Sequence, residues 1–170
     1  MGELDQWTHC PRCGAEVTPQ SGKVECPECG LTVYASSKPT ASAACLDHEG
    51  RVLLARRGVE PHKDLWDFPG GFVEEEEHPL DCLRRELREE AGVDVEPLEF
   101  LGVWLDKYGG DGSAATTLNL YWTARIVAGT VEPADDVAEL RWFSPEEVDE
   151  AQLAFPHTRE VLSALRQQQA

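Results

Sequence analysis

The stretch Gly71–Val93, read as GFVEEEEHPLDCLRRELREEAGV, decides the fold of this chain. Apolar residues recur in it at helical intervals, at Leu80, Leu83, Leu87 and Ala91. Pro79 suits a first helical position, and Gly92 suits the residue just past a helix end. The pattern therefore predicts one helix over residues 79–91.

Three carboxylates, Glu86, Glu89 and Glu90, fall on one flank of this helix, beside the leucine stripe, at about 100° per residue. Like charges at these spacings repel, and the neighbouring arginines lie mostly on another flank. A hard divalent cation would remove the conflict, because Mg²⁺ prefers carboxylate oxygens and water and usually bridges to substrate phosphates. The competing interpretation is a solvated charged helix face without a metal.

The stretch resembles the Nudix box, G-x5-E-x7-R-E-U-x-E-E-x-G-U, in which U is aliphatic. Every fixed position of that pattern is met, by Gly71, Glu77, Arg85, Glu86, Leu87, Glu89, Glu90, Gly92 and Val93. The preceding residues 65–70, LWDFPG, also look like the approach to that box. Nudix proteins typically hydrolyse a nucleoside diphosphate linked to another moiety. The resemblance implies an α/β fold, an α/β/α sandwich with a mixed sheet, over residues 38–170.

The resemblance also implies a mechanism, in which water attacks one phosphorus of a diphosphate with the help of Mg²⁺ or Mn²⁺. The family's metal-binding positions correspond to Glu86, Glu89 and Glu90, a Gly70 or Gly71 carbonyl, and Glu77 in an outer position. Arg85 would orient these carboxylates by ion pairing. The base that takes the water's proton comes either from the box or from a distant loop. The loop candidates are Asp135, Asp136 and Glu139, with Asp136 first, against the alternative of a solvated acidic loop.

The first thirty residues predict a separate zinc site. Cys10-Pro11-Arg12-Cys13-Gly14 and Cys26-Pro27-Glu28-Cys29-Gly30 repeat one CPxCG pattern. Four thiolates from two such knuckles complete the closed tetrahedral shell of a structural Zn²⁺, whereas disulfides or redox chemistry are the alternatives. This segment resembles a zinc ribbon, assigned to residues 1–37. Cys45 and Cys82 are expected to be buried thiols, and His9 is expected to be a surface histidine rather than a substitute ligand.

Composition limits the partners. With a net charge of −17, the chain has no broad cationic surface, so binding to duplex nucleic acid is not expected. Apolar runs stay below the roughly 18 residues of a membrane span, and the start MGELDQWTH lacks a signal pattern. We therefore expect a cytoplasmic protein without membrane contact, acting on a nucleotide-derived small molecule; a homodimer is left open.

The remaining elements are predicted from local patterns. Two strands, at residues 40–46 and 51–56, flank a turn at 47–50 and give a hairpin signal. Further strands are expected around Trp66 and at residues 98–105, 116–126 and 140–143. A glycine-rich mobile loop is expected at 108–113, a helix start with Ser144 as N-cap, and a final helix at 158–166.

Five residues near the box are candidates for substrate binding. Arg56 and Arg57 suit phosphate contact, with solvated surface as the alternative. Trp66, Phe68 and Tyr108 are candidates to stack on a base, although such aromatics are more often core residues.

The chain lacks the SQPWPFPxS motif of the NADH pyrophosphatases, and no other substrate rule is met cleanly. The ribbon and the two arginines nevertheless favour a dinucleotide or ADP-sugar over a nucleoside triphosphate. A nucleotide-sensing or adaptor module is the second class of function, against which the intact box argues.

Overall fold

The computed structural model describes residues 4–109 and 115–169. The chain divides into two compact units, one of residues 1–37 with 107–116 and one of residues 38–106 with 117–170. Most of the glycine-rich loop predicted at 108–113 lies outside the described residues. Within the described ranges, no helix has the length and apolar character of a membrane span.

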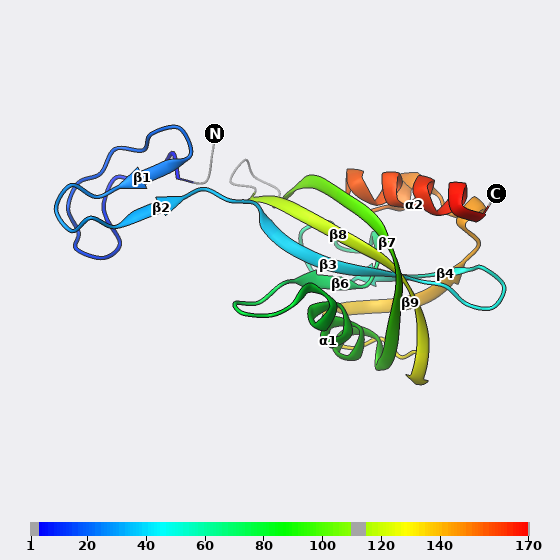
Figure 1. The fold of residues 1–170 in the computed structure, drawn as a ribbon. Coiled ribbons are helices and arrows are strands. Elements are labelled where there is room, and N and C mark those ends of the chain that lie inside the picture. The colour runs from blue at the N-terminus through cyan, green and yellow to red at the C-terminus, as the bar shows by residue number, and fades with distance from the viewer. Residues whose placement is uncertain (1–3, 110–114, 170) are drawn as a thin grey trace. The chain divides into compact units, whose positions relative to one another are not determined.

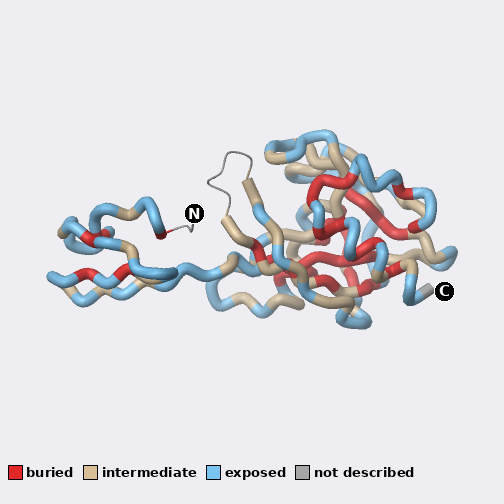
Figure 2. Tube along the Cα trace, turned by 90° about the horizontal axis from the view of Figure 1, so that it is seen from above, coloured by how far each residue is buried: buried red, intermediate tan, exposed pale blue. Residues whose placement is uncertain are grey.

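The N-terminal unit contains a two-stranded antiparallel sheet. Strand β1 (Lys23–Glu25) pairs with β2 (Thr32–Tyr34), and Lys23 lies opposite Tyr34. A small core packs beneath it, formed by Leu4, Cys10, Val17, Val24 and Cys26. Figure 2 marks buried positions in this unit in red. So few buried residues contribute little stability alone, and a bound metal would add to it.

The larger unit is built on two sheets. The four-stranded sheet has the order β6 (Gly70–Phe72), β3 (Lys38–Cys45), β8 (Ala115–Gly129) and β7 (Val93–Tyr108). It is mixed, because β3 runs antiparallel to β6 and parallel to β8. The three-stranded sheet is antiparallel, with the order β5 (Trp66–Asp67), β4 (Val52–Arg57) and β9 (Val137–Phe143).

Two helices cover opposite faces of these strands, as Figure 1 shows for α1 (Pro79–Ala91) and α2 (Pro156–Gln169). Side chains alternate along a strand, so β3 and β4 contribute to two cores. Ala43 and Leu53 pack with α1, whereas Ala44 and Leu54 pack with α2. The predicted α/β/α sandwich is confirmed.

Helix α1 begins and ends where its sequence predicts. His78 is the N-cap, and its Nδ1 accepts a hydrogen bond from the Leu80 N–H at 3.2 Å. Pro79 follows in the first turn. Gly92 adopts the left-handed conformation, with φ 68°, and its N–H donates to the Arg88 carbonyl at 3.1 Å. Both ends are therefore fixed by local capping.

Two other local predictions are wrong in detail. The turn at 47–50 forms, but β3 and β4 diverge into different sheets after a single bridge between Leu46 and Val52, so they make no extended hairpin. Ser144 is the N-cap and Pro145 follows it in the first turn, as predicted, but the Ser144 side chain makes no capping bond and the helix is a short 3-10 helix, η1 (Pro145–Glu147). A second 3-10 helix, η2 (Glu150–Gln152), follows before α2. The strands β7 and β8 extend beyond their predicted bounds.

Candidate active site

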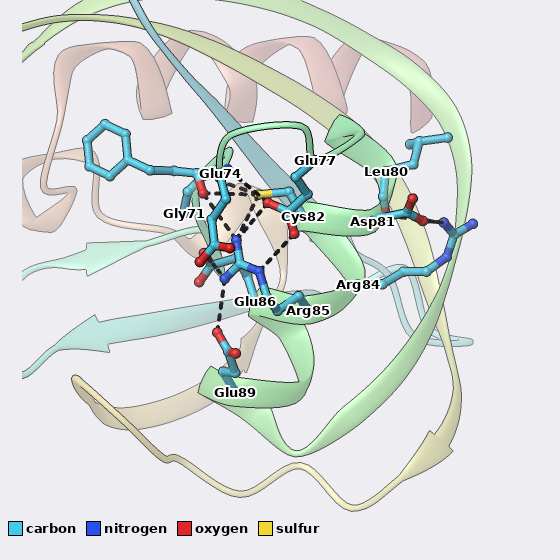
Figure 3. Close-up of polar contacts among 11 residues, drawn as sticks. Gly71, Glu74, Glu77, Leu80, Asp81, Cys82, Arg84, Arg85, Glu86 and Glu89 are labelled. Atoms are coloured by element: carbon cyan, nitrogen blue, oxygen red, sulfur yellow. Dashed lines mark hydrogen bonds and ion pairs between the residues drawn. The ribbon is translucent and has the colours of Figure 1, made fainter.

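Arg85 of α1 lies at the centre of a carboxylate cluster (Figure 3). Its Nε and Nη2 donate to the two oxygens of Glu77 at 2.8 and 2.9 Å, a bidentate pair. Its Nη1 donates to Glu86 at 2.7 Å and to Glu89 at 3.0 Å, and Nη2 also donates to the Phe72 carbonyl. Arg85 therefore holds three acidic side chains in fixed relative positions.

Two glycines of β6 allow the helix carboxylates to approach the backbone closely. A Cβ at Gly71 would lie 2.4 Å from Glu86 Oε1, so only glycine leaves room for that carboxylate. The Gly70 N–H donates to Glu90 Oε2 at 2.8 Å. The Glu86 and Glu90 carboxylates of α1 therefore lie directly against the backbone of β6.

The surroundings of the carboxylates shift their pKa values in different directions. Hydrogen bonding from Arg85 holds the pKa of Glu77 at about 2, below the ordinary 4.5. Burial raises the pKa of Glu86, although Arg85 opposes the shift. Burial also raises the pKa of Glu90 well above its ordinary value; the Gly70 N–H opposes this shift, and the Glu86 and Asp136 charges add to it. These mutually repelling oxygens could hold a hard divalent cation, which would relieve the conflict.

The loop before β9 is fastened to the end of α1. The Ala134 N–H donates to the Glu90 carbonyl at 3.0 Å, and the Gly58 N–H donates to the Asp136 carbonyl at 2.6 Å. The Asp136 charge is among the causes that raise the pKa of Glu90. Glu139 is instead paired with Arg56 and Arg141. The Glu139 carboxylate is therefore occupied by two arginines, and the choice of Asp136 among the loop acids stays a prediction.

The four cysteines of the CPxCG repeats come together in the N-terminal unit. Their sulfur atoms all lie within 4.8 Å of one another, with Cys13 Sγ 3.5 Å from Cys26 Sγ and Cys10 Sγ 3.6 Å from Cys29 Sγ. A tetrahedron with Zn–S bonds of about 2.3 Å requires sulfur separations of about 3.8 Å, so the cluster fits zinc. All six cysteines of the chain are free thiols, which argues against disulfides between the knuckles.

The remaining cysteine and histidine predictions concern Cys45, Cys82 and His9. Cys45 and Cys82 are buried as expected, and burial raises the pKa of each thiol to about 12. His9 is exposed and contacts Thr8 rather than the cysteines. Among residues 4–109 and 115–169, the cysteines are the one group whose metal-ligating atoms already lie this close together. The box carboxylates instead converge on the Arg85 guanidinium.

The predicted phosphate-binding arginines both have protein partners. Arg56 forms ion pairs with Glu139 at 3.1 Å and Asp64 at 3.0 Å. Arg57 Nε donates to the Pro61 carbonyl at 2.7 Å, and its guanidinium lies 5.4 Å from the centre of the Phe155 ring. A phosphate at Arg56 would compete with two carboxylates.

The predicted base-stacking aromatics occupy three different environments. Phe68 is 3% exposed and packs edge-on against Tyr121, so it is a core residue and is left out of the proposed site. Trp66 is half-buried, with Phe143 at its edge and the Arg141 guanidinium 5.2 Å from its ring centre. Tyr108 ends β7 and is grouped with the N-terminal compact unit, and its role in binding substrate stays a prediction.

Sequence reasoning missed a polar group beside the box. Burial raises the pKa of the Asp67 carboxyl to about 6, the charge of His157 opposes this shift, and the Asp67 charge adds to the raised pKa of Glu90. His157 itself bonds to Asp106 and Tyr121. These residues come from distant parts of the chain and form no motif, so no sequence signal could have assembled them.

The fold and the carboxylate cluster together define the class. The NUDIX domain family matches residues 36–165, and the chain belongs to that family. A crystal structure of a NUDIX hydrolase from Nitrosomonas europaea superposes with a TM-score of 0.77, covering 96% of this chain and 93% of that one, at 24% identity.

Two further proteins are similar to this chain in sequence. The NAD-capped RNA hydrolase NudC of Pseudomonas aeruginosa (strain LESB58) is 31% identical over 138 residues, which are 79% of this chain and 47% of that protein. The CTP pyrophosphohydrolase of Escherichia coli (strain K12) is 33% identical over 114 residues, 66% of this chain and 80% of that protein. The chain thus spans about half the length of the NudC proteins that it matches.

Proposed function

We propose that the chain is a hydrolase that uses Mg²⁺ or Mn²⁺ to cleave a nucleoside diphosphate linked to another moiety. The observation that carries the proposal is the Arg85-centred cluster, in which Glu77, Glu86 and Glu89 converge on one guanidinium. Glu90 adds a fourth carboxylate at the Gly70 N–H. Membership of the NUDIX family supports the same chemistry.

Each residue of the cluster then has a role. Glu86, Glu89 and Glu90, with a β6 carbonyl and Glu77 farther out, would hold the divalent cation. When bound, the cation would offset charge on the phosphate oxygens and acidify the attacking water. Arg85 orients the carboxylates and has few donors left for substrate, because all three of its nitrogens already donate to them.

The base is assigned to Asp136. Its carboxylate acts on Glu90, and the backbone bonds of Gly58 and Ala134 fasten its loop beside the helix end. A general base must lie within hydrogen-bond reach of the water, directly or through one more water. Asp136→Asn should therefore slow turnover with little change in cation affinity. Unchanged kinetics would exclude Asp136 as the base.

The proposed substrate is a dinucleotide or an ADP-sugar diphosphate rather than a nucleoside triphosphate. The NudC similarity supports a dinucleotide-type linkage, whereas similarity to a CTP pyrophosphohydrolase supports the alternative of a triphosphate. Arg57, beside Phe155, and the half-buried Trp66 are the candidates to bind groups flanking the diphosphate.

The rest of the proposal concerns the whole chain. Residues 1–37 would form a zinc ribbon with a structural Zn²⁺ on Cys10, Cys13, Cys26 and Cys29, and residues 38–170 the hydrolase domain. The site would take a nucleotide-derived small molecule rather than a membrane or duplex nucleic acid. Six free thiols are consistent with a cytoplasmic location. A homodimer is left open.

A panel assay tests the proposed activity. Values of kcat/KM would be measured with Mg²⁺ for NADH, FAD, ADP-ribose and the nucleoside triphosphates. We expect a diphosphate-linked compound to be preferred, and a triphosphate preferred by more than about tenfold, roughly 1.4 kcal/mol, would overturn the substrate class. Binding without turnover of any compound would indicate a sensor instead.

Charge removal in the box tests the site. Glu89→Gln and Glu90→Gln keep size and polarity but remove a cation-binding charge, so turnover should fall at least about 100-fold while folding survives. Glu160→Gln, an exposed change on α2, is the matched control and should retain activity. Near-normal turnover in both box variants would refute the assignment.

A further inference from the structure

A chain of buried polar side chains crosses the face of the sheet covered by α2. Asp106 of β7 accepts hydrogen bonds from His157 Nδ1 at 2.8 Å and from the His157 N–H at 3.0 Å. Nδ1 therefore carries the hydrogen, which leaves Nε2 to accept from the Tyr121 hydroxyl at 2.9 Å. Tyr121 is 1% exposed and His157 is 6% exposed, so water does not supply these bonds.

The far end of this chain reaches the backbone that holds Glu90. Tyr121 of β8 also lies opposite Ser42 of β3 in the parallel β3–β8 pair. Ser42 lies opposite Gly70 in the β3–β6 pair, and a Cβ on Gly70 would be only 2.5 Å from Ser42 Oγ. Gly70 is the residue whose N–H donates to Glu90 Oε2. Four side chains thus connect the start of α2 to the hydrogen bond that positions Glu90.

Stability alone gives a weak reason for this arrangement. Buried polar groups cost desolvation free energy, and apolar residues of similar volume often stabilise a core as well or better. No buried side-chain nitrogen or oxygen in the described ranges lacks a partner, so this network is fully satisfied. A satisfied network fixes one geometry, because every shift breaks a directional bond.

We infer that Ser42, Tyr121, His157 and Asp106 are positioning residues for the proposed metal site. They fix the backbone of β6 at Gly70, and through it they aim the Glu90 carboxylate. The inference rests on the proposed function for its effect on turnover. Its effect on cation binding is independent of which substrate is cleaved. Residues that orient a ligand in this way typically affect metal affinity by about 10- to 100-fold.

Tyr121→Phe is the first test, because it removes one hydroxyl and keeps the ring that packs against Phe68 and Trp104. The affinity of metal-depleted full-length protein for Mn²⁺, measured by electron paramagnetic resonance, should fall about tenfold. With the best substrate of the panel, kcat should fall about tenfold while KM changes less than about twofold. Thermal unfolding is recorded in parallel.

Thr158→Val is the matched control. Thr158 is fully buried at the start of α2, and its hydroxyl donates to the Phe155 carbonyl at 2.6 Å. The variant therefore loses one buried hydrogen bond of the same helix outside the proposed chain. We expect a loss of Tm comparable to that of Tyr121→Phe, with unchanged Mn²⁺ affinity and kcat.

Ser42→Ala is a second variant, introduced into a strand that already contains Ala41, Ala43 and Ala44. If both positions act through Gly70, the double variant with Tyr121→Phe should bind Mn²⁺ no more weakly than the worse single variant. Additive losses, or variants that lose Tm but keep Mn²⁺ affinity, would overturn the inference. If wild type binds Mn²⁺ but cleaves nothing in the panel, the proposed function fails and the Mn²⁺ titrations still decide this one.

Discussion

Replacing Gly71 with alanine should move the Glu86 carboxylate while the protein stays folded. The new Cβ would lie 2.4 Å from Glu86 Oε1, whereas ordinary contact begins near 3.4 Å, so the carboxylate must retreat by about 1 Å. Gly71 does not lie in the left-handed region, and the obstructing atoms end a flexible side chain. The backbone can therefore accept alanine.

The cost to stability follows from that movement. An off-rotamer side chain costs about 1 kcal/mol, and weakening the bond from Arg85 to Glu86 adds on the order of 1 kcal/mol. The Gly71→Ala protein should thus stay folded at ambient temperature. Turnover should fall on the order of 100-fold, because a misplacement of about 1 Å in a reacting assembly has that effect.

Gly70→Ala provides the contrast. Its Cβ would meet the Ala41 carbonyl oxygen and Ser42 Cα at 2.5 Å, both backbone atoms, and Gly70 has φ 146°. This change should break the β3–β6 pair and cost several kcal/mol. Circular dichroism melts and kcat at saturating Mg²⁺ would be compared for both variants. Wild-type turnover in Gly71→Ala would refute the reasoning that Glu86 must sit against Gly71.

Two further predictions concern charge and zinc. Because Arg85 holds the pKa of Glu77 at about 2 against an ordinary 4.5, their pairing stabilises the folded state above about pH 4.5 and is lost as pH falls toward 2. In EDTA, the advantage of wild type over Glu77→Gln in unfolding free energy should shrink by at most about 3 kcal/mol between about pH 6 and pH 2, with parallel curves as the contradicting result. Metal analysis should find one zinc per chain, and Cys26→Ser should release it and unfold residues 1–37 while the NUDIX core survives. Retention of zinc there would contradict the four-cysteine site, and Cys45→Ala, at a buried thiol of the other unit, is the control.

Helix α1 could be predicted to the residue because its signals are local. Proline, glycine and the leucine spacing act within one segment, and the box pattern places the acids on the same helix. The hairpin of residues 40–56 was wrong for the opposite reason. The partners of β3 are β6 and β8, and Thr40 bonds to Asn119 of β8 across 79 residues, which no local pattern encodes.

The predictions for the site also depend on whether the contacting residues lie close together in the sequence. The resemblance to the Nudix box implied that Arg85 pairs with the box carboxylates, and the structure adds the bidentate form of its pair with Glu77. The link from Asp106 through His157 to Tyr121 joins residues 51 and 36 positions apart. Phe68, a stacking candidate by its sequence neighbours, is instead packed in the core by Tyr121. Tertiary packing decided each of these cases.

The parallel pairing of β3 with β8 also sets the order in which the molecule can fold. Contacts across 79 residues carry a large loop-closure entropy, so this pairing should form slowly, within milliseconds to seconds. Until it forms, α1 has no complete surface on which to bury Leu83 and Leu87. Partly folded chains would expose that apolar face to one another during this interval. Their net charge of −17 would make them repel one another, so we expect the acidic composition to oppose aggregation while this pairing forms.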